Sequence, residues 1–447
     1  MNKLGSNKKL GMWLGLVLIL SLFLRVMLFA IYSPVTFSDT GGYQRSAQAV
    51  LNGFANYDGT RTPVYPILIA LTGSEKMLYL SQLIIGLCIT LAWFIIGWKA
   101  SKKPFIGALI ALAHTLNPGQ FFFEANLLTE TLAAFWLILS LLGAYFWLAD
   151  RKYQSTWLAL GIGISTSLAA LTRPQFIFMP LWLAIFLAFS SQDRKSRFNF
   201  KPFIGVLLPA LVLIGGWTAW IYSRYNILSV TTMSGFHLVQ HSGYYFEDLP
   251  DEYAAIRDTY IAFRDTRLDT FGTQSNTIWE AIPALQEASG LNFYDLSQTL
   301  QDLSVKLLLS HPWQYLAKVF KGWLWFWRAP VYWRQSAFTL PGISSIMVLW
   351  VWLARGLMVL MNLVFVLSSI AALISERLRH YFNLNSFHWL LAGSIWITSI
   401  FTSLLEHGEN QRFLIPLQTA VVFWALWIIY FTWQARTANP GTVRAVN

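Results

Sequence analysis

The chain alternates between long apolar runs and shorter polar segments. A helix needs about 20 apolar residues to cross the hydrocarbon core of a bilayer. Ten runs reach or approach this length, and the third, fifth and sixth are short: 11–31, 77–98, 104–118, 126–149, 156–172, 175–191, 202–222, 352–374, 387–405 and 412–433. The pattern predicts an all-α polytopic membrane protein with about ten transmembrane helices.

One connection between the runs is long and polar. From about 223 to 340 charged residues cluster, and the periodicity predicts helices near 250–268, 275–289, 294–309 and 311–328. The last of these carries Lys318 and Lys321 among aromatic residues, which favours a helix lying in the membrane interface. An eleventh span there is the alternative, and it would reverse the topology of everything after it.

The chain therefore divides into three predicted parts. Residues 1–222 form an N-terminal transmembrane module whose first outer loop is 32–76, residues 223–340 form an extracytoplasmic helical region, and residues 341–447 form a C-terminal transmembrane module. Arg355 would cost about 2.5–3.5 kcal/mol at the centre of a span. We therefore expect Arg355 at the outer boundary, with 341–354 as an interfacial helix.

Composition supports a membrane protein. Of 447 residues, 55% are hydrophobic and 12% are charged, against about 25% charged in soluble domains. A net charge of +11 in a soluble protein would suggest a nucleic-acid partner, but in a membrane protein it reflects loop charges that fix topology, so no nucleic acid is expected. The single cysteine, Cys88, excludes a disulfide within the chain.

Lys and Arg alternate between the two sides of the predicted spans. The short outer loops hold only Arg45, Arg61, Lys76, Arg173 and Arg412. The inner segments hold Lys3, Lys8, Lys9, Lys99, Lys102, Lys103, Arg151, Lys152, Arg194, Lys195, Arg197, Lys201, Arg377, Arg379, Arg436 and Arg444. The positive-inside rule predicts a multi-pass protein of the plasma (inner) membrane with both termini cytoplasmic and 11–31 retained as an anchor rather than cleaved as a signal peptide.

Candidate chemistry begins where the first apolar run ends, at Ser38-Asp39-Thr40-Gly41-Gly42-Tyr43. A carboxylate at the bilayer edge can take a proton from a substrate that lies partly in the membrane. The alternative is that Asp39 caps a short surface helix, because Asp is a favoured N-cap and the two glycines suit a turn.

Polar residues recur on the same outer side. They are Asp39, Tyr43, Arg61 and Tyr65 in the first loop, Glu124, Asn126, Thr129 and Glu130 in the second, Arg173, Pro174 and Gln175 in the third, and His407, Glu409, Asn410, Gln411 and Arg412 in the last. Their common side favours one site, against the alternative that loops are simply polar.

Three of these residues stand out by position. Glu130 lies in or at the lip of an apolar run, where an unpaired carboxylate is costly. Arg173 closes one span and opens the next, and a structural salt bridge between Glu130 and Arg173 is an alternative reading of both. Arg412 begins the last span as the chain enters lipid.

The order of these motifs resembles the GT-C glycosyltransferases, of the protein O-mannosyltransferase or aminoarabinose-transferase-like kind. Arg25 near the outer end of the first helix, then Asp39, then the Arg-Thr-Pro-x-Tyr-Pro box at 61–66, and Arg412-Phe-Leu-Ile-Pro416 carry the resemblance. Such enzymes move a sugar from a polyprenyl-phosphate carrier to an acceptor.

The resemblance implies roles for individual residues. Asp39 takes the place of the essential acidic residue of the first outer loop, Glu130 or less surely Glu124 that of the acidic residue of the second, and Arg412 that of an arginine holding the carrier phosphate. Arg173-Pro174 looks like the family's Arg-Pro at a helix junction. Thr40 stands where many relatives carry a second acidic residue, which puts a metal role at Asp39 in doubt.

We thus expect Asp39 and Glu130 as catalytic residues, with Asp39 the base, and a set of substrate-binding residues: Tyr43, Arg61, Tyr65, Glu124, Arg173, His407 and Arg412. The partners implied are a polyprenyl-phosphate-sugar donor, membrane lipids and a hydroxyl acceptor on a protein, lipid or cell-surface glycan. No cofactor is indicated. A divalent metal stays an open alternative, because His237 and His241 are four residues apart and His407 stands between Glu406 and Glu409.

Two other classes compete with the enzyme. A lipid-linked-saccharide flippase or other transporter would place ionisable residues near the bilayer midplane and often shows inverted repeats. Here the charges gather at one face and no repeat is visible, which favours the enzyme. A non-catalytic membrane subunit is the third class, and it predicts that Asp39 is replaceable.

Overall fold

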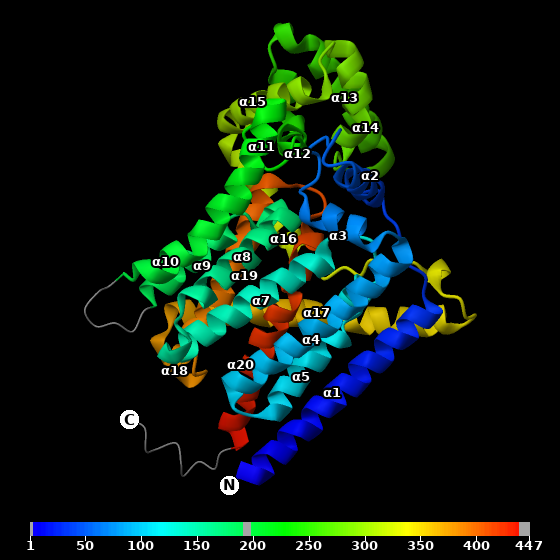
Figure 1. The fold of residues 1–447 in the computed structure, drawn as a ribbon. Coiled ribbons are helices and arrows are strands. Elements are labelled where there is room, and N and C mark those ends of the chain that lie inside the picture. The colour runs from blue at the N-terminus through cyan, green and yellow to red at the C-terminus, as the bar shows by residue number, and fades with distance from the viewer. Residues whose placement is uncertain (1–2, 191–197, 438–447) are drawn as a thin grey trace.

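The computed structural model describes residues 3–190 and 198–437, and each predicted apolar run is mainly helical within these ranges (Figure 1). Seven helical segments are long and apolar enough to cross a membrane, and three are shorter. The long segments are residues 8–31 of α1 (Lys3–Ile31), α4 (Glu75–Ser101), α7 (Glu130–Ala149), α10 to α11 (Phe200–Tyr225), α17 (Ile343–Ile374), α19 (Ser386–Leu405) and η7 to α20 (Asn410–Thr437). The shorter ones are α5 (Pro104–Thr115), α8 (Thr156–Thr172) and η2 to α9 (Pro174–Phe189). The predicted all-α polytopic membrane fold is confirmed.

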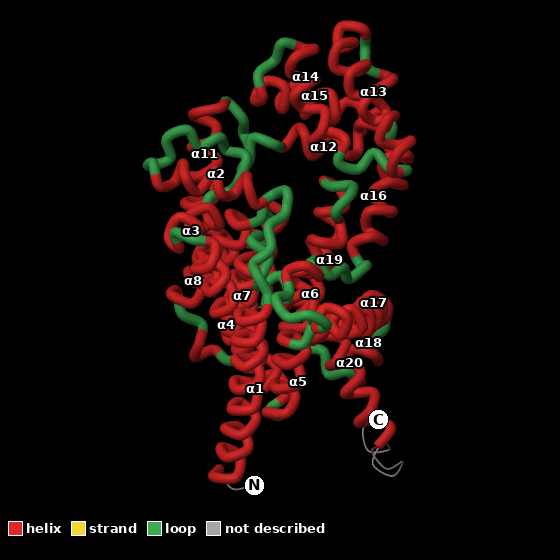
Figure 2. The backbone as a smooth tube through the Cα atoms, turned by 90° about the vertical axis from the view of Figure 1, so that its right-hand side faces the viewer, coloured by secondary structure: helices red, strands yellow, loops and turns green. Residues whose placement is uncertain are grey.

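Eight further elements are short helices that connect the longer ones. They are α2 (Thr40–Leu51), α3 (Val64–Thr72), α6 (Pro118–Phe121), η1 (Arg151–Tyr153), η4 (Gly243–Asp248), η5 (Asp251–Tyr253), η6 (Gln335–Ala337) and α18 (Glu376–Tyr381). Helices dominate the described ranges and loops connect them (Figure 2), while pairing of extended backbone is limited to two isolated bridges, Tyr32 with Phe338 and Val35 with Asn126. These bridges join the end of α1 to the segments that precede α7 and α17.

The main core lies among the spans and not in the outer region. Consecutive helices α4 and α5, and α7 and α8, pack as antiparallel pairs, and small residues such as Ala133 and Ala144 of α7 are fully buried between larger ones such as Trp424 of α20. Burial of these apolar residues stabilises the bundle, in which α7 packs against η7 (Asn410–Leu417), the start of the last apolar segment. The first turn of each of these two segments carries a predicted site residue, Glu130 and Arg412.

The polar connection folds into an outer helical region with its own core. Four predicted helices are confirmed as α13 (Ala254–Phe271), α14 (Thr277–Ser289), α15 (Phe293–Ser310) and α16 (Pro312–Phe326), and α12 (Ser234–Ser242) precedes them. Phe236, Tyr260, Leu285 and Leu300 pack together there without solvent exposure. In Figure 1 this region lies at the end of the molecule opposite to the start of α1 and the end of α20.

α17 differs from the expectation. It is one continuous helix of 32 residues, so residues 341–354 do not form a separate interfacial helix. Arg355 lies within it, solvent- or lipid-exposed, with its guanidinium over the Trp352 ring. The arginine does not end the helix because its side chain points out of the bundle, and Figure 1 shows α17 running across the bundle at a shallower slope than α1 or α4.

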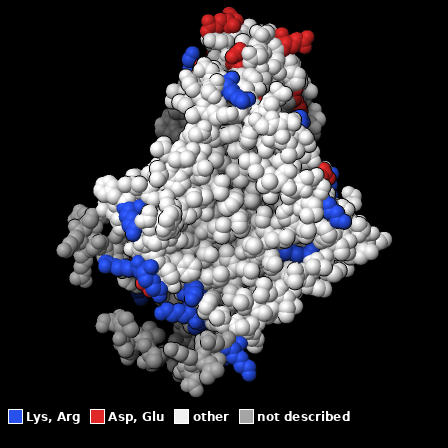
Figure 3. Space-filling model, viewed as in Figure 1, with Lys and Arg blue, Asp and Glu red and all other residues white. Residues whose placement is uncertain are grey.

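Charge is distributed unevenly between the two ends. Figure 3 shows Lys and Arg side chains gathered toward the end where α1 starts, while Asp and Glu lie mainly at the opposite tip. The surface between them is almost free of charge on this face. This is the distribution that the positive-inside rule requires if the basic end faces the cytoplasm.

Candidate functional site

Asp39 sits at the N-cap position of α2, but its side chain does not cap the helix. Its backbone has helical dihedral angles and its carboxylate makes no capping hydrogen bond. The carboxylate instead accepts hydrogen bonds from Arg61 Nη2 at 3.1 Å and from Arg412 Nη1 at 2.8 Å. The backbone of Asp39 thus marks the start of α2, while its side chain is used to bind two arginines and not to cap the helix.

Two opposing effects act on the Asp39 carboxyl. Burial raises its pKa, and the charges of Arg412 and Arg61 lower it by more, so the net shift is downward. Asp39 is therefore ionised at neutral pH. Its side chain keeps 32% exposure, so a substrate can still reach it.

Arg412 is the centre of the cluster. It lies in the first turn of η7 (Asn410–Leu417), and its guanidinium contacts three carboxylates: Asp39 at 2.8 Å, Glu409 at 3.2 Å and Glu130 through Nε. Its side chain is 9% exposed. Arg412 carries one positive charge and contacts three carboxylates. It can therefore exchange one of these contacts for an incoming anion and still be paired with a carboxylate.

Glu130 occupies the first turn of α7 with no solvent exposure. Arg173, between α8 and η2, donates to Glu130 Oε1 at 2.6 Å and to Thr129 Oγ1 at 2.9 Å. The expected salt bridge between Glu130 and Arg173 is present, but Glu130 also accepts from Arg412. The pair is thus one part of a network of three arginines and three carboxylates, whose formal charges cancel.

Two tyrosines line the cluster beneath Arg61. The Arg61 guanidinium lies 4.9 Å from the centroid of the Tyr43 ring, and Tyr43 and Tyr65 meet edge to face at 5.2 Å. Tyr65 is fully buried and donates to Gln82 Oε1 at 2.9 Å. A Cβ at Gly42 would lie 3.0 Å from Arg61 Nε, so a larger residue there would require the Arg61 guanidinium to shift.

Glu124 lies outside this cluster. Its carboxylate is bound by Arg25 of α1 at 2.5 and 2.7 Å, and both side chains are 3% exposed. Thr90 and Thr115 complete the polar surroundings of Arg25. The structure therefore pairs Glu124 with the first helix and does not bring it to Asp39.

His407 also lies away from Asp39. Its ring is 5.4 Å from that of His241 on α12 and stacks on Trp325 of α16 at 5.1 Å. His237, four residues before His241, pairs instead with Glu406 at 2.9 Å. Among the residues that the structure describes, no three His, Cys, Asp or Glu side chains are arranged to hold a metal ion.

Glu409 joins the cluster although it was not a selected candidate. Burial, together with the nearby Asp39, raises its pKa, and Arg412 opposes that rise without cancelling it. Thr129 and Gln175 likewise contact Arg173. The sequence signal for Glu409 was its spacing, three residues before Arg412 in a turn, which places both side chains on one side.

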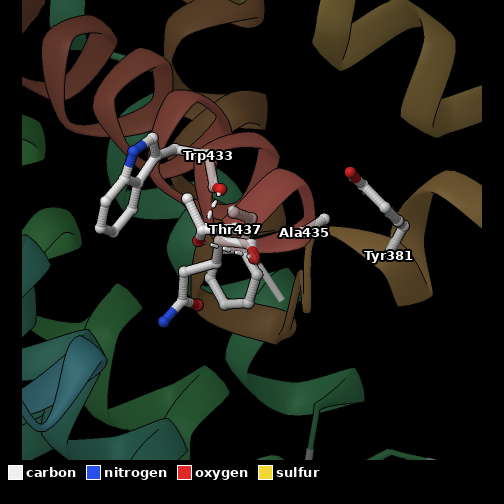
Figure 4. A pocket seen from close by; sticks show the side chains of 6 residues that line it. Tyr381, Trp433, Ala435 and Thr437 are labelled. Atoms are coloured by element: carbon white, nitrogen blue, oxygen red, sulfur yellow. Dashed lines mark hydrogen bonds between the residues drawn. The ribbon is translucent and has the colours of Figure 1, made fainter. Parts of the chain in front are cut away.

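A hollow elsewhere in the molecule does not compete with this site. An open hollow of about 520 Å³ lies between α18 and the end of α20, and Figure 4 shows the side chains that line it. Its lining has no charged side chain and consists of Tyr381, Phe431, Trp433, Gln434, Ala435 and Thr437. It cannot balance charge during a reaction, so the arginine and carboxylate cluster is the candidate site.

The protein is thus an integral, polytopic helical membrane protein with an ionised cluster at the end covered by its outer helices. Its structure is similar to the crystal structure of ArnT from Cupriavidus metallidurans bound to undecaprenyl phosphate, with 15% sequence identity and a TM-score of 0.38, over 92% of this chain and 78% of that chain. No family model and no curated protein matches the sequence. Because the identity and the TM-score are this low, no residue role is transferred from ArnT to this chain.

Proposed function

We propose that this protein is a glycosyltransferase that moves a sugar from a polyprenyl-phosphate donor to a hydroxyl group of an acceptor on the extracytoplasmic side. The observation that carries the proposal is the position of Arg412, which joins Asp39 and Glu130 at the start of the last apolar segment. A cation and an accessible carboxylate are held side by side where the bilayer meets water. This is the pair that transfer from a lipid-linked phosphate needs.

The donor phosphate is bound by Arg412. A guanidinium binds a phosphate through two parallel hydrogen bonds and remains charged at any pH the protein meets. The contact of Arg412 with Glu409, at 3.2 Å, is longer than its contact with Asp39, at 2.8 Å. Glu409 also has a raised pKa because of its burial, so it is the carboxyl most easily displaced by the phosphate.

Asp39 acts as the general base. The acceptor hydroxyl gives its proton to the carboxylate as its oxygen forms a bond to C1 of the sugar. The bond between C1 and the phosphate oxygen breaks, and the electron pair leaves with the polyprenyl phosphate, whose charge Arg412 balances. A positioned base contributes typically about 10²–10⁴-fold to the rate.

Donor binding prepares this base. In the free protein the charges of Arg412 and Arg61 hold the Asp39 pKa low, which makes it a weak base. A phosphate on Arg412 takes up part of that positive charge, so the Asp39 pKa rises when the donor is bound. The carboxylate therefore becomes a stronger base only when there is a sugar to transfer.

Glu130 positions the arginines. It is fully buried and touches both Arg412 and Arg173, so it meets no substrate in this arrangement and fixes the guanidinium instead. The outer helices α12 to α16 face the extracytoplasmic side and cover the site, and both termini are cytoplasmic.

The test is transfer of a radiolabelled sugar from a panel of polyprenyl-phosphate donors in membranes that contain the protein. We expect product that depends on the expressed chain and on a phosphate-linked lipid donor. Membranes lacking the chain are the background control. Movement of an intact lipid-linked saccharide across vesicle membranes, with no transfer from any donor, would overturn the proposal in favour of a flippase.

A further inference from the structure

A second group of basic side chains lies around the loop that precedes Arg412. It consists of His241 on α12, His407 in the loop, and Lys318 and Lys321 on α16. The two histidine rings are 5.4 Å apart. Burial lowers the pKa of His407 to about 4, and the nearby charges of Lys318 and Lys321 contribute to this shift. Hereafter these four residues are called the basic cluster.

Three buried imidazole nitrogens of the basic cluster lack hydrogen-bond partners among the described residues. His241 and His407 are each 1% exposed, yet neither ring nitrogen of His241 and not Nδ1 of His407 has a hydrogen-bond partner among the described residues. The backbone carbonyls of Ser403 and Glu406 lie close enough to act on the His241 pKa, without completing a hydrogen bond. Buried polar nitrogens without partners are uncommon in native structures.

The two lysines also lack a counter-ion. Within the described ranges neither makes an ion pair; Lys318 Nζ lies 3.8 Å from the Tyr244 ring centroid and Lys321 Nζ lies 5.1 Å from that of Trp325. Glu406, the acidic residue directly before His407 in the sequence, is bound by His237 and Gln240. Positive charge is thus gathered without compensation beside unpartnered imidazoles.

The basic cluster is tied to the loop of the proposed active site. Asn410, which is fully buried, bonds to the backbone of Glu406 and Gly408. It also packs against Gly322 of α16, where a Cβ would come within 3.1 Å of Asn410 Nδ2. Arg412 follows His407 by five positions in the chain, so their Cα atoms are at most about 18 Å apart.

We propose that His241, His407, Lys318 and Lys321 form a second anion-binding site, separate from the Asp39 cluster, that takes a phosphate-type oxyanion of the acceptor. The assignment to the acceptor rests on the proposed function, in which Arg412 is occupied by the donor phosphate. The spacing of the two sites fits an acceptor whose anionic group lies within the length of a short saccharide from the reacting hydroxyl.

α16 suits an acceptor that is held in the membrane. One of its faces exposes Trp313, Leu316, Phe320 and Leu324, while the other carries Lys318 and packs toward α12 and the loop. A helix with an apolar face and adjacent lysines lies at the level of lipid head groups. The oxyanion can therefore come from a lipid head group or from a soluble phosphorylated glycan, and the two sources are separable by experiment.

The test measures binding without turnover, on the full chain. In the first arm inorganic phosphate is titrated at constant ionic strength and the thermal unfolding midpoint of the detergent-solubilised protein is recorded. In the second arm the protein is placed in nanodiscs of phosphatidylcholine that also contain phosphatidic acid. Native mass spectrometry then counts the phosphatidic acid molecules that stay bound to the protein. The variants are Lys318→Gln with Lys321→Gln, and His407→Gln. Lys306→Gln, an exposed lysine of α15, is the matched control.

We expect the wild type and Lys306→Gln to bind alike, and the double lysine variant to bind the oxyanion about tenfold or more weakly, because charge-assisted hydrogen bonds are lost. Retention of phosphatidic acid without an effect of free phosphate would assign the site to a lipid head group. An effect of free phosphate without retention of phosphatidic acid would assign it to a soluble phosphorylated glycan. If the double lysine variant fails to fold, the same binding measurement on Lys321→Gln alone decides the outcome, because Lys321 is exposed and its replacement leaves the packing of α16 intact. Equal binding by all variants, or no binding by the wild type in either arm, would overturn the site.

The site and the proposed function fail separately. A protein that binds the oxyanion through these residues but transfers no sugar refutes the function and leaves the site. A protein that transfers sugar with an acceptor KM unchanged in the double lysine variant refutes the acceptor assignment and leaves the function.

Discussion

Arg412 Nη1 lies 2.8 Å from Asp39 Oδ2, although 373 residues separate the two in the chain. The contact joins the loop after the first helix to the start of the last one. Arg412 is nearly buried and Asp39 is about one-third exposed. An anion that reaches Arg412 from the bilayer edge therefore also meets the Asp39 carboxylate.

Arg412→Lys should abolish most transfer without unfolding the protein. A lysine keeps the charge but cannot contact Asp39, Glu130 and Glu409 together or bind a phosphate through two parallel bonds. We expect kcat to fall by about 10²–10³-fold, the range for removing one preorganised donor at a transition-state charge. The measurement is sugar transfer at matched expression. Arg334→Lys, on an exposed arginine of the outer side, is the control, and a near wild-type rate in Arg412→Lys would contradict the role of Arg412.

The pH profile should differ between free protein and donor complex. Burial raises the Asp39 pKa, but Arg412 and Arg61 lower it by more, so in the free protein Asp39 loses its charge only when the pH falls below its ordinary value near 3.8. The stability from this ion pair is present above that value and is lost as the pH falls through the lower folded pKa. Donor phosphate weakens the effect of Arg412, so the pKa is higher in the complex.

The profile of kcat/KM reports the free enzyme and that of kcat the complex. The acid limb of kcat should therefore lie at higher pH than the acid limb of kcat/KM for the donor. Initial rates over a pH series give both. Coincident limbs would show that the phosphate does not change the charge around Asp39.

Glu124 gives a stability prediction. It forms a buried ion pair with Arg25, and removing one partner leaves the other charge buried, at a cost of about 3–5 kcal/mol. Glu124→Gln should therefore lower the thermal unfolding midpoint, and Arg25→Met combined with Glu124→Leu should recover part of the loss. A Glu124→Gln protein as stable as the wild type but defective in transfer would instead support the expectation that Glu124 binds substrate.

Topology is testable by labelling of introduced cysteines with a membrane-impermeant maleimide. Asp251→Cys, in the outer helical region, should react in intact cells. Lys102→Cys, between α4 and α5, should react only after the membrane is opened. A background in which Cys88 is serine removes the native thiol. Labelling of Lys102→Cys in intact cells would reverse the orientation that the charge distribution predicts.

Much of the fold followed from the apolar pattern because a membrane demands long apolar helices. The ten runs and the four helices of the polar connection were predictable. The path of α17 was not, because the cost of Arg355 depends on whether its side chain faces the bundle or its surroundings, and a linear pattern gives no such direction.

The site was predictable in part for the same reason. The alternation of apolar runs predicts on which side of the membrane a residue lies. It predicted one side for Asp39, Arg61, Glu130, Arg173 and Arg412, and ion pairs join these five residues in the structure. It does not fix lateral position, and Glu124 and His407, although predicted on the same side, meet different partners, Arg25 and Trp325. Lateral position depends on helix packing, which spacing alone does not supply.

The most direct test compares Asp39→Asn with Asp58→Asn in the sugar-transfer assay, at matched expression, with donor binding measured separately. Both changes keep the side-chain size and remove one carboxylate from the same outer loop, but the Asp58 carboxylate accepts its hydrogen bonds from Thr60 of its own turn and contacts neither Arg61 nor Arg412 in the hydrogen bonds of the described residues. We expect Asp39→Asn to lose about 10²–10⁴-fold in rate while still binding donor, and Asp58→Asn to remain near the wild type. Equal transfer by the wild type and Asp39→Asn would contradict the assignment of Asp39 as the base.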